Sequence, residues 1–174
     1  MINHQNIELI EIEWFFSGYI VNSLHNHPPK TVHIMSKHQT VIDSYLRCVE
    51  SEDFFDQFYD YFLSADPEVD RMFRFVNFSK QKELIRKGLM SMLTFLDSGN
   101  IAGKVTFRRL RDTHGSKGMN VQGHHYELWK TCLMRTIADT DPEFDEELRL
   151  MWDAVLDKGI LFMQEEQGDF VRSR

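Results

Sequence analysis

Apolar side chains recur at helical spacing along most of the chain from about residue 38 onward, and no stretch alternates as a strand would. Positions three or four apart lie side by side on a helix, so each such run presents one apolar face. The runs predict helices over 54–64, 78–96, 103–114, 126–137 and 144–163. The pattern therefore predicts an all-α domain built around one core.

Short polar segments mark where several of these helices begin or end. In Asp66-Pro67-Glu68 and again in Asp141-Pro142-Glu143, an Asp precedes a Pro and a Glu, which is the arrangement of a capped helix start. Ser98-Gly99-Asn100 predicts the end of the long helix. A connection punctuated by glycines runs from Gly115 to Gly123 and leads into the next helix.

Residues 1–34 differ from the rest of the chain and are predicted to form an N-terminal extension to a domain at 35–174. The segment His25-Asn26-His27-Pro28-Pro29 breaks any helix, and the sequence leaves open that Met35 is the natural start. Three histidines near the end of the extension have no neighbouring Cys or carboxylate partners, which favours solvated side chains over a metal site. They are His25, His27 and His33.

Composition narrows the classes of partner and the compartment. The net charge of -7 over 174 residues argues against nucleic acid or an anionic membrane as a partner, because both require clustered Lys and Arg. Cys48 and Cys132 are too few for a disulfide framework, so we expect a reducing compartment, the cytoplasm. The apolar stretch 7–24 contains three glutamates, which fits neither a secretory signal nor a membrane span.

One histidine stands where a protein could present a single imidazole to a metal. His114 ends a predicted amphipathic helix and precedes a glycine turn. The order Phe58-Tyr59, Phe73, Lys80-Gln81 and His114-Gly115 resembles the globin family, most closely the bacterial single-domain and truncated haemoglobins. The resemblance covers about residues 41–167 and implies a globin-like helical sandwich with a short first helix and a pocket for haem b.

The resemblance implies a role for each side of the haem. His114 corresponds to the proximal iron ligand, and Leu110, one turn earlier on the same face, to the residue packed beneath the porphyrin. Phe73 corresponds to the corner phenylalanine stacked on the ring.

On the distal side the resemblance implies Tyr59 and Gln81 as the polar residues, with Leu84 or Ile85 next along the pocket wall. Trp129 matches a tryptophan that some truncated globins place beside the bound ligand. A different helix register would make Arg86 or Lys87 the distal residue instead of Gln81.

The pair His124-His125 is the other candidate for metal chemistry. Neighbouring residues on a helix point about 100° apart, so we expect that both cannot face one metal and that they are polar residues of a helix start.

We therefore expect reversible binding of O2, NO or CO with high O2 affinity, suited to scavenging, NO detoxification or sensing. A tyrosine hydroxyl and a glutamine amide both donate hydrogen bonds, which retain bound O2. The chain has no flavin or nicotinamide fingerprint, so NO dioxygenase or peroxidase-like activity would need a separate reductase. A homodimer stays open, and the alternative function is a haem-free regulatory or docking domain.

Overall fold

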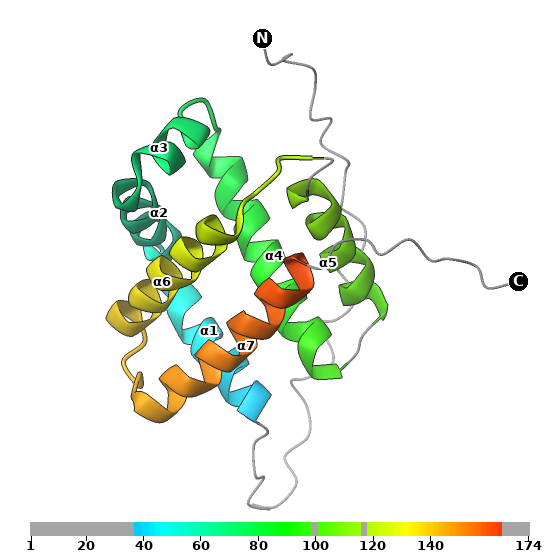
Figure 1. Ribbon diagram of the computed structural model, residues 1–174. Coiled ribbons are helices and arrows are strands. Elements are labelled where there is room, and N and C mark those ends of the chain that lie inside the picture. The colour runs from blue at the N-terminus through cyan, green and yellow to red at the C-terminus, as the bar shows by residue number, and fades with distance from the viewer. Residues whose placement is uncertain (1–36, 99–100, 116–117, 165–174) are drawn as a thin grey trace, which may run out of the picture. The chain divides into compact units, whose positions relative to one another are not determined.

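The computed structural model describes residues 37–98, 101–115 and 118–164, and within these ranges the chain forms seven α-helices and no β-strand (Figure 1). The all-α prediction is therefore confirmed. The predicted extension, with His25, His27 and His33, lies outside the described residues.

The helices follow the order predicted from the apolar pattern. The helix predicted to begin at Tyr126 begins earlier, at Gly123, because His125 takes part in a capping box with Gln122 there. The helices are α1 (Lys37–Glu50), α2 (Phe54–Ala65), α3 (Pro67–Phe73), α4 (Phe78–Ser98), α5 (Ile101–His114), α6 (Gly123–Thr140) and α7 (Glu146–Gln164).

The two Asp-Pro-Glu segments behave differently. At the first, the Asp66 carboxylate accepts a hydrogen bond of 2.6 Å from the Glu68 amide, so α3 begins as predicted. At the second, residues 142–143 form a turn and α7 begins only at Glu146, so the predicted helix start is wrong. Asp145 caps α7 instead, accepting from the Leu148 amide at 2.8 Å.

The Asp141 carboxylate accepts from the Glu143 amide at 3.0 Å, as Asp66 does from Glu68, and it also binds side chains of α1. Ser44 Oγ donates to Asp141 Oδ2 at 2.6 Å, and Arg47 donates to both carboxylate oxygens at 2.7 and 2.8 Å. Trp152 Nε1 on α7 donates in turn to Ser44 Oγ at 2.9 Å. Asp141, Ser44, Arg47 and Trp152 form what we call the Asp141 cluster, which ties α1 to α7 and to the segment between α6 and α7.

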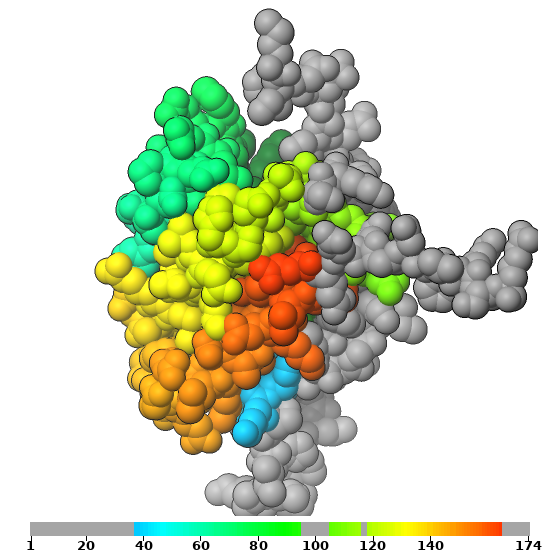
Figure 2. Space-filling model, in the orientation of Figure 1, coloured from blue at the N-terminus to red at the C-terminus, as the bar shows by residue number. Residues whose placement is uncertain are grey.

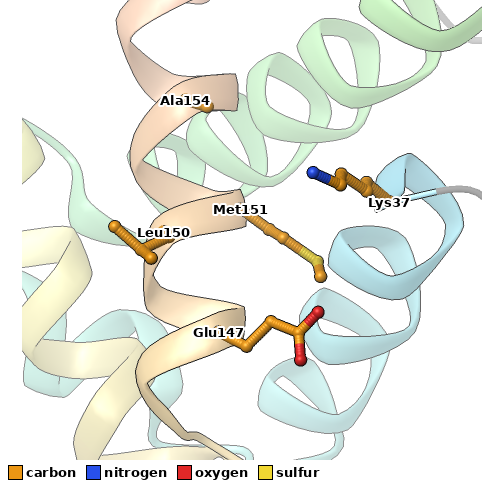
Figure 3. Close-up of a pocket in the computed structure, with 5 residues that line it drawn as sticks. All are labelled: Lys37, Glu147, Leu150, Met151 and Ala154. Carbon is orange, nitrogen blue, oxygen red and sulfur yellow. The ribbon is translucent and has the colours of Figure 1, made fainter.

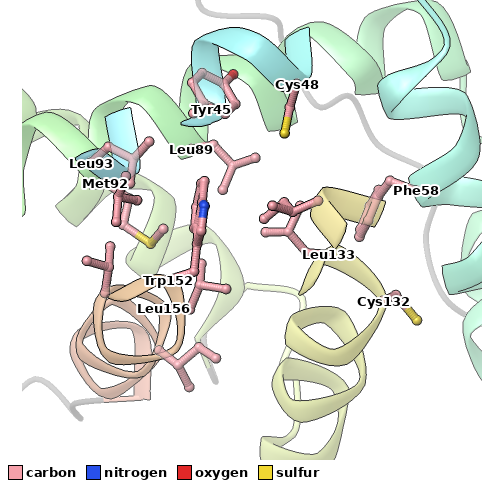
Figure 4. Packing of buried hydrophobic residues seen from close by; sticks show 14 of the residues in the cluster. Tyr45, Cys48, Phe58, Leu89, Met92, Leu93, Cys132, Leu133, Trp152 and Leu156 are labelled. Carbon is pink, nitrogen blue, oxygen red and sulfur yellow. The ribbon is translucent and has the colours of Figure 1, made fainter. Parts of the chain in front are cut away.

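Large apolar side chains from α1, α2, α4, α6 and α7 form one core (Figure 4). Trp152 and Leu156 of α7 are fully buried, as are Leu93 of α4 and Leu133 of α6. Gly159 lets α7 cross α4 closely, since a Cβ there would overlap Met92 Sδ. Leu84, expected to point inward from α4, is 49% exposed.

Candidate functional site

Five rings from α2, α3 and the start of α4 pack against one another in a cluster that we call the aromatic pocket. Tyr59 lies at its centre, 5.9 Å from the Phe73 ring and 5.4 Å from the Phe78 ring. Phe62 contacts Phe73 edge-on at 5.8 Å, and Phe58 lies 5.0 Å from Tyr59. The corner phenylalanine and the tyrosine singled out in the sequence are thus brought together.

Tyr59 keeps its hydroxyl proton at neutral pH. The residue is 5% exposed, and burial raises its pKa to about 12, while the neighbouring Gln81 side chain opposes this rise. Gln81 therefore lies near Tyr59. Arg86 instead stacks over Phe55, 5.3 Å from the ring centre, and Lys87 is exposed.

His114 is a neutral imidazole, and one of its ring nitrogens is hydrogen-bonded to the backbone. Its Nδ1 lies 2.8 Å from the Leu110 carbonyl oxygen, which can only accept, so Nδ1 carries the ring proton. Nε2 therefore keeps its lone pair, which is the form that binds a metal. Burial lowers the pKa of His114, although the bond to Leu110 opposes this, and the lowered pKa favours the neutral ring.

The contact between α4 and α5 determines which part of α4 lies opposite His114. These helices are neighbours that run in opposite directions (Figure 1). A Cβ on Gly88 would lie 3.5 Å from Leu110 Cδ2, so the two helices approach closely at this point. One turn further along α5 is His114, and one turn back along α4 is Ile85, so helix geometry places these two at a similar level.

The backbone after His114 folds back onto the end of α5. The Val121 amide donates to the His114 carbonyl and the Met119 amide to the Thr113 carbonyl, each at 2.9 Å. Gly118 is required for this return, because a Cβ there would overlap the Thr113 carbonyl, and Asn120 adopts a positive φ of 53°. The helix end that carries His114 is therefore fixed by its own connection to α6.

The remaining predicted site residues lie around these groups. Trp129 is partly buried on α6, and its ring meets Phe58 edge-on at 6.5 Å. Ile85 packs partly buried against the core, whereas Leu84 is half-exposed, so Ile85 is the better wall residue of the two.

Phe62 and Phe78 belong to the aromatic pocket but were not singled out in the sequence. Phe62 follows Tyr59 at i+3, so the helical spacing of α2 contained this signal. Phe78 contacts the pocket only because the chain turns at the corner after α3, and no local pattern predicts that turn.

The expectation for His124-His125 is half right: both lie in the first turn of α6 as predicted, but their side chains converge. Their ring centres lie 4.0 Å apart, and the two Nε2 atoms lie 4.0 and 3.9 Å from one oxygen of Glu68. The side chains converge although their Cβ atoms diverge, because the His125 ring turns back so that its Nδ1 accepts from the Gln122 amide.

A pocket between α1 and α7 is separate from all these residues (Figure 3). Its volume is about 170 Å³, below the roughly 300–1,000 Å³ typical of small-molecule sites. Its lining is mostly apolar, with Lys37 at one side, and includes none of the predicted site residues.

Comparisons with known proteins support the fold. The globin family model matches residues 56–161. The chain is also similar to the crystal structure of protein PA3967 from Pseudomonas aeruginosa PAO1, described as structurally highly homologous to a human hemoglobin, with 29% identity and a TM-score of 0.69. The similarity covers 74% of this chain and 95% of that one. No curated protein matches, and among the described helices none is long and apolar enough to cross a membrane.

Proposed function

Because this chain belongs to the globin family, we propose that its domain at residues 35–174 holds haem b on His114 and binds a diatomic gas reversibly. The observation that carries the proposal is the hydrogen bond from His114 Nδ1 to the Leu110 carbonyl, which leaves Nε2 as a ligand nitrogen. The chemistry of this donor fits haem, whose iron takes a neutral imidazole as its proximal ligand.

The neighbourhood of His114 also fits a flat apolar ring. Leu110 lies one turn below the imidazole and packs at the contact with α4. Phe73 offers a ring face within the aromatic pocket, and Ile85 stands at the level of His114 on the facing helix. Large apolar side chains with a few polar groups are what small-molecule sites use.

Haem supplies an iron atom to which O2, NO or CO binds. The chain's own contribution on that side is a pair of neighbouring donors, the Tyr59 hydroxyl and the Gln81 amide. Because burial keeps the Tyr59 hydroxyl protonated, it can donate throughout the physiological pH range.

Such a donor pair favours retention over delivery. One hydrogen bond to a charged acceptor contributes about 1.5–3 kcal/mol, which slows release roughly 10- to 100-fold. We therefore propose scavenging, NO detoxification or sensing rather than bulk O2 transport.

The partners in this proposal are a diatomic gas and, for NO dioxygenation or peroxidase-like turnover, a separate reductase that supplies electrons. A cytoplasmic location is also part of it, supported by Cys48 and Cys132, which are buried and free. Burial raises the pKa of the Cys48 thiol to about 12, so this thiol is unreactive at neutral pH.

A visible spectrum tests the proposal. Protein produced with added haem should show an intense Soret band that shifts when the ferrous form binds CO, and His114→Ala should lose this haem or hold it only loosely. Arg108→Ala is the matched control, since it removes an exposed side chain from the same helix and should leave the spectrum unchanged. A folded wild-type protein that stays colourless would contradict the proposal and favour a haem-free docking domain.

A further inference from the structure

Three side chains with metal-binding atoms meet between α3 and the start of α6. Glu68 lies in the first turn of α3, and His124 and His125 lie in the first turn of α6. One ligand atom from each residue lies within 4.8 Å of the other two. In Figure 2 the start of α6 adjoins the green segment that contains α3.

His125 gives independent evidence that this cluster binds something. Its side chain is 7% exposed, and its Nε2 is buried with no hydrogen-bond partner among the described residues. Nε2 is directed toward Glu68, but at 3.9 Å from Oε2 it is too far for a hydrogen bond. Buried polar atoms in native proteins are almost always partnered, so this nitrogen calls for a partner.

We propose that Glu68, His124 and His125 form a binding site for a divalent transition-metal ion of the zinc class. Two imidazoles and one carboxylate are a ligand set that Zn²⁺ uses when it keeps a fourth position for water. Imidazole selects against Mg²⁺ and Ca²⁺, which prefer oxygen ligands. The site is distinct from His114, which belongs to α5 and carries the proposed haem.

The geometry needs only small movements to close. Ligand atoms around a tetrahedral zinc ion with bonds of 2.0–2.1 Å lie about 3.3 Å apart, compared with 3.9 and 4.0 Å to Glu68 here. Glu68 and His124 are 55% and 59% exposed, so both side chains are free to adjust toward the buried His125.

Metal binding also requires a change of tautomer at His125. Its Nδ1 now accepts a hydrogen bond of 3.3 Å from the Gln122 amide, so the neutral ring carries its proton on Nε2. When Nε2 binds a metal, that proton moves to Nδ1 and the long capping bond opens.

A metal at this site would join α3 directly to α6. α3 ends at Phe73, whose ring belongs to the aromatic pocket. The metal would therefore hold this end of the pocket against α6. The ion would steady this end of the pocket, with its fourth position left to water.

Zinc titration of the full-length, untagged, haem-loaded protein tests the site. Calorimetry should find about one Zn²⁺ ion bound through these three ligands, and Mg²⁺ should not bind. Glu68→Gln and His124→Ala should each weaken Zn²⁺ binding by about tenfold or more, since even second-shell changes at metal sites cost about 10–100-fold. Both residues are exposed, so the variants should fold. Asp70→Asn removes another exposed carboxylate from α3 and should leave the Zn²⁺ affinity unchanged.

X-ray absorption at the zinc edge supplies a second measurement, with imidazole nitrogens expected at about 2.0–2.1 Å. Absence of stoichiometric Zn²⁺ binding would overturn the proposal. Binding that survives both Glu68→Gln and His124→Ala would overturn it too, because the ion would then bind elsewhere in the chain.

Discussion

The Asp141 cluster and the aromatic pocket both bury polar side chains, but they satisfy them in different ways. In the Asp141 cluster a carboxylate, a guanidinium, a hydroxyl and an indole bind one another. In the aromatic pocket and its neighbour α5, burial keeps Tyr59 and His114 neutral, and His114 keeps a ligand nitrogen available. The first arrangement is complete within the chain, whereas the second is suited to receive a ligand.

The pKa values express the same difference. Burial by itself would raise the pKa of Asp141, but hydrogen bonds from Arg47 and Ser44 outweigh it and hold the pKa below its usual value. Burial dominates at Tyr59 and His114, where no charged partner opposes it. The charged form of Asp141 is favoured by folding and so stabilises the fold. Tyr59 and His114 stay neutral, which leaves a proton and a lone pair for binding a ligand.

Removing the charge from the Asp141 cluster should produce the largest stability loss that we predict. Asp141→Ala leaves Arg47 and Ser44 without their partner, and we expect unfolding to become easier by about 2–4 kcal/mol, less than for a fully buried pair because Arg47 is partly exposed. Urea denaturation of the haem-free protein measures this.

Glu143→Gln is the matched control, because Glu143 also contacts Arg47 but is 70% exposed, so it should cost less than about 1 kcal/mol. Equal losses for the two variants would show that the cluster has no special role in stability.

Tyr59→Phe should leave stability nearly unchanged and act on ligand release instead. Loss of one donor should speed O2 dissociation by roughly 10- to 100-fold, and Gln81→Leu should act in the same direction. Stopped-flow O2 dissociation measures both. Unchanged O2 dissociation in both variants would show that neither side chain donates to the bound ligand.

Lowering the pH should reveal how much the Asp141 cluster contributes to stability. The pKa of Asp141 is lower in the folded protein than its ordinary value of 3.8, so its contribution to stability is present above that value and is lost as the pH falls through the folded pKa. We expect wild type to lose more stability than Asp141→Asn as the pH is lowered from 5 toward 2. Parallel urea midpoints for the two proteins across this range would contradict the assignment.

The smallest effect is expected at the contact between α4 and α5. A Cβ on Gly88 would lie at an ordinary contact distance from Leu110, so Gly88→Ala should be accommodated. Alanine is favoured over glycine inside a helix by about 0.5–1 kcal/mol, so the variant should be slightly more stable. A lower melting temperature would show that the helices approach more closely than this, while an unchanged haem spectrum would show that the contact does not limit the site.

The helices could be predicted from sequence because their signals are local. Apolar spacing identified α2, α4 and the apolar face of α7, and the Asp66 cap identified the start of α3. The same capping bond forms at Asp141, where the carboxylate accepts from the Glu143 amide, but the chain continues as a turn and α7 begins only after Asp145. The local pattern predicts the bond but not the turn that follows it.

The candidate site divides in the same way. The family resemblance predicts Tyr59 and Gln81 as a pair, and the two side chains lie near each other. Phe78 and the convergence on Glu68 could not be predicted, because both depend on the path of the chain between helices. The rule that neighbouring helical side chains diverge describes Cβ directions, and the ends of long side chains need not follow it.

The short connection from α5 to α6 links the two proposed metal sites. The Val121 amide is bonded to the His114 carbonyl, and the next amide, that of Gln122, is bonded to His125. Because these two amides are consecutive, the segment that fixes the end of α5 also caps the start of α6. A substitution that disturbs the backbone at Val121 or Gln122 would therefore act on both histidines at once.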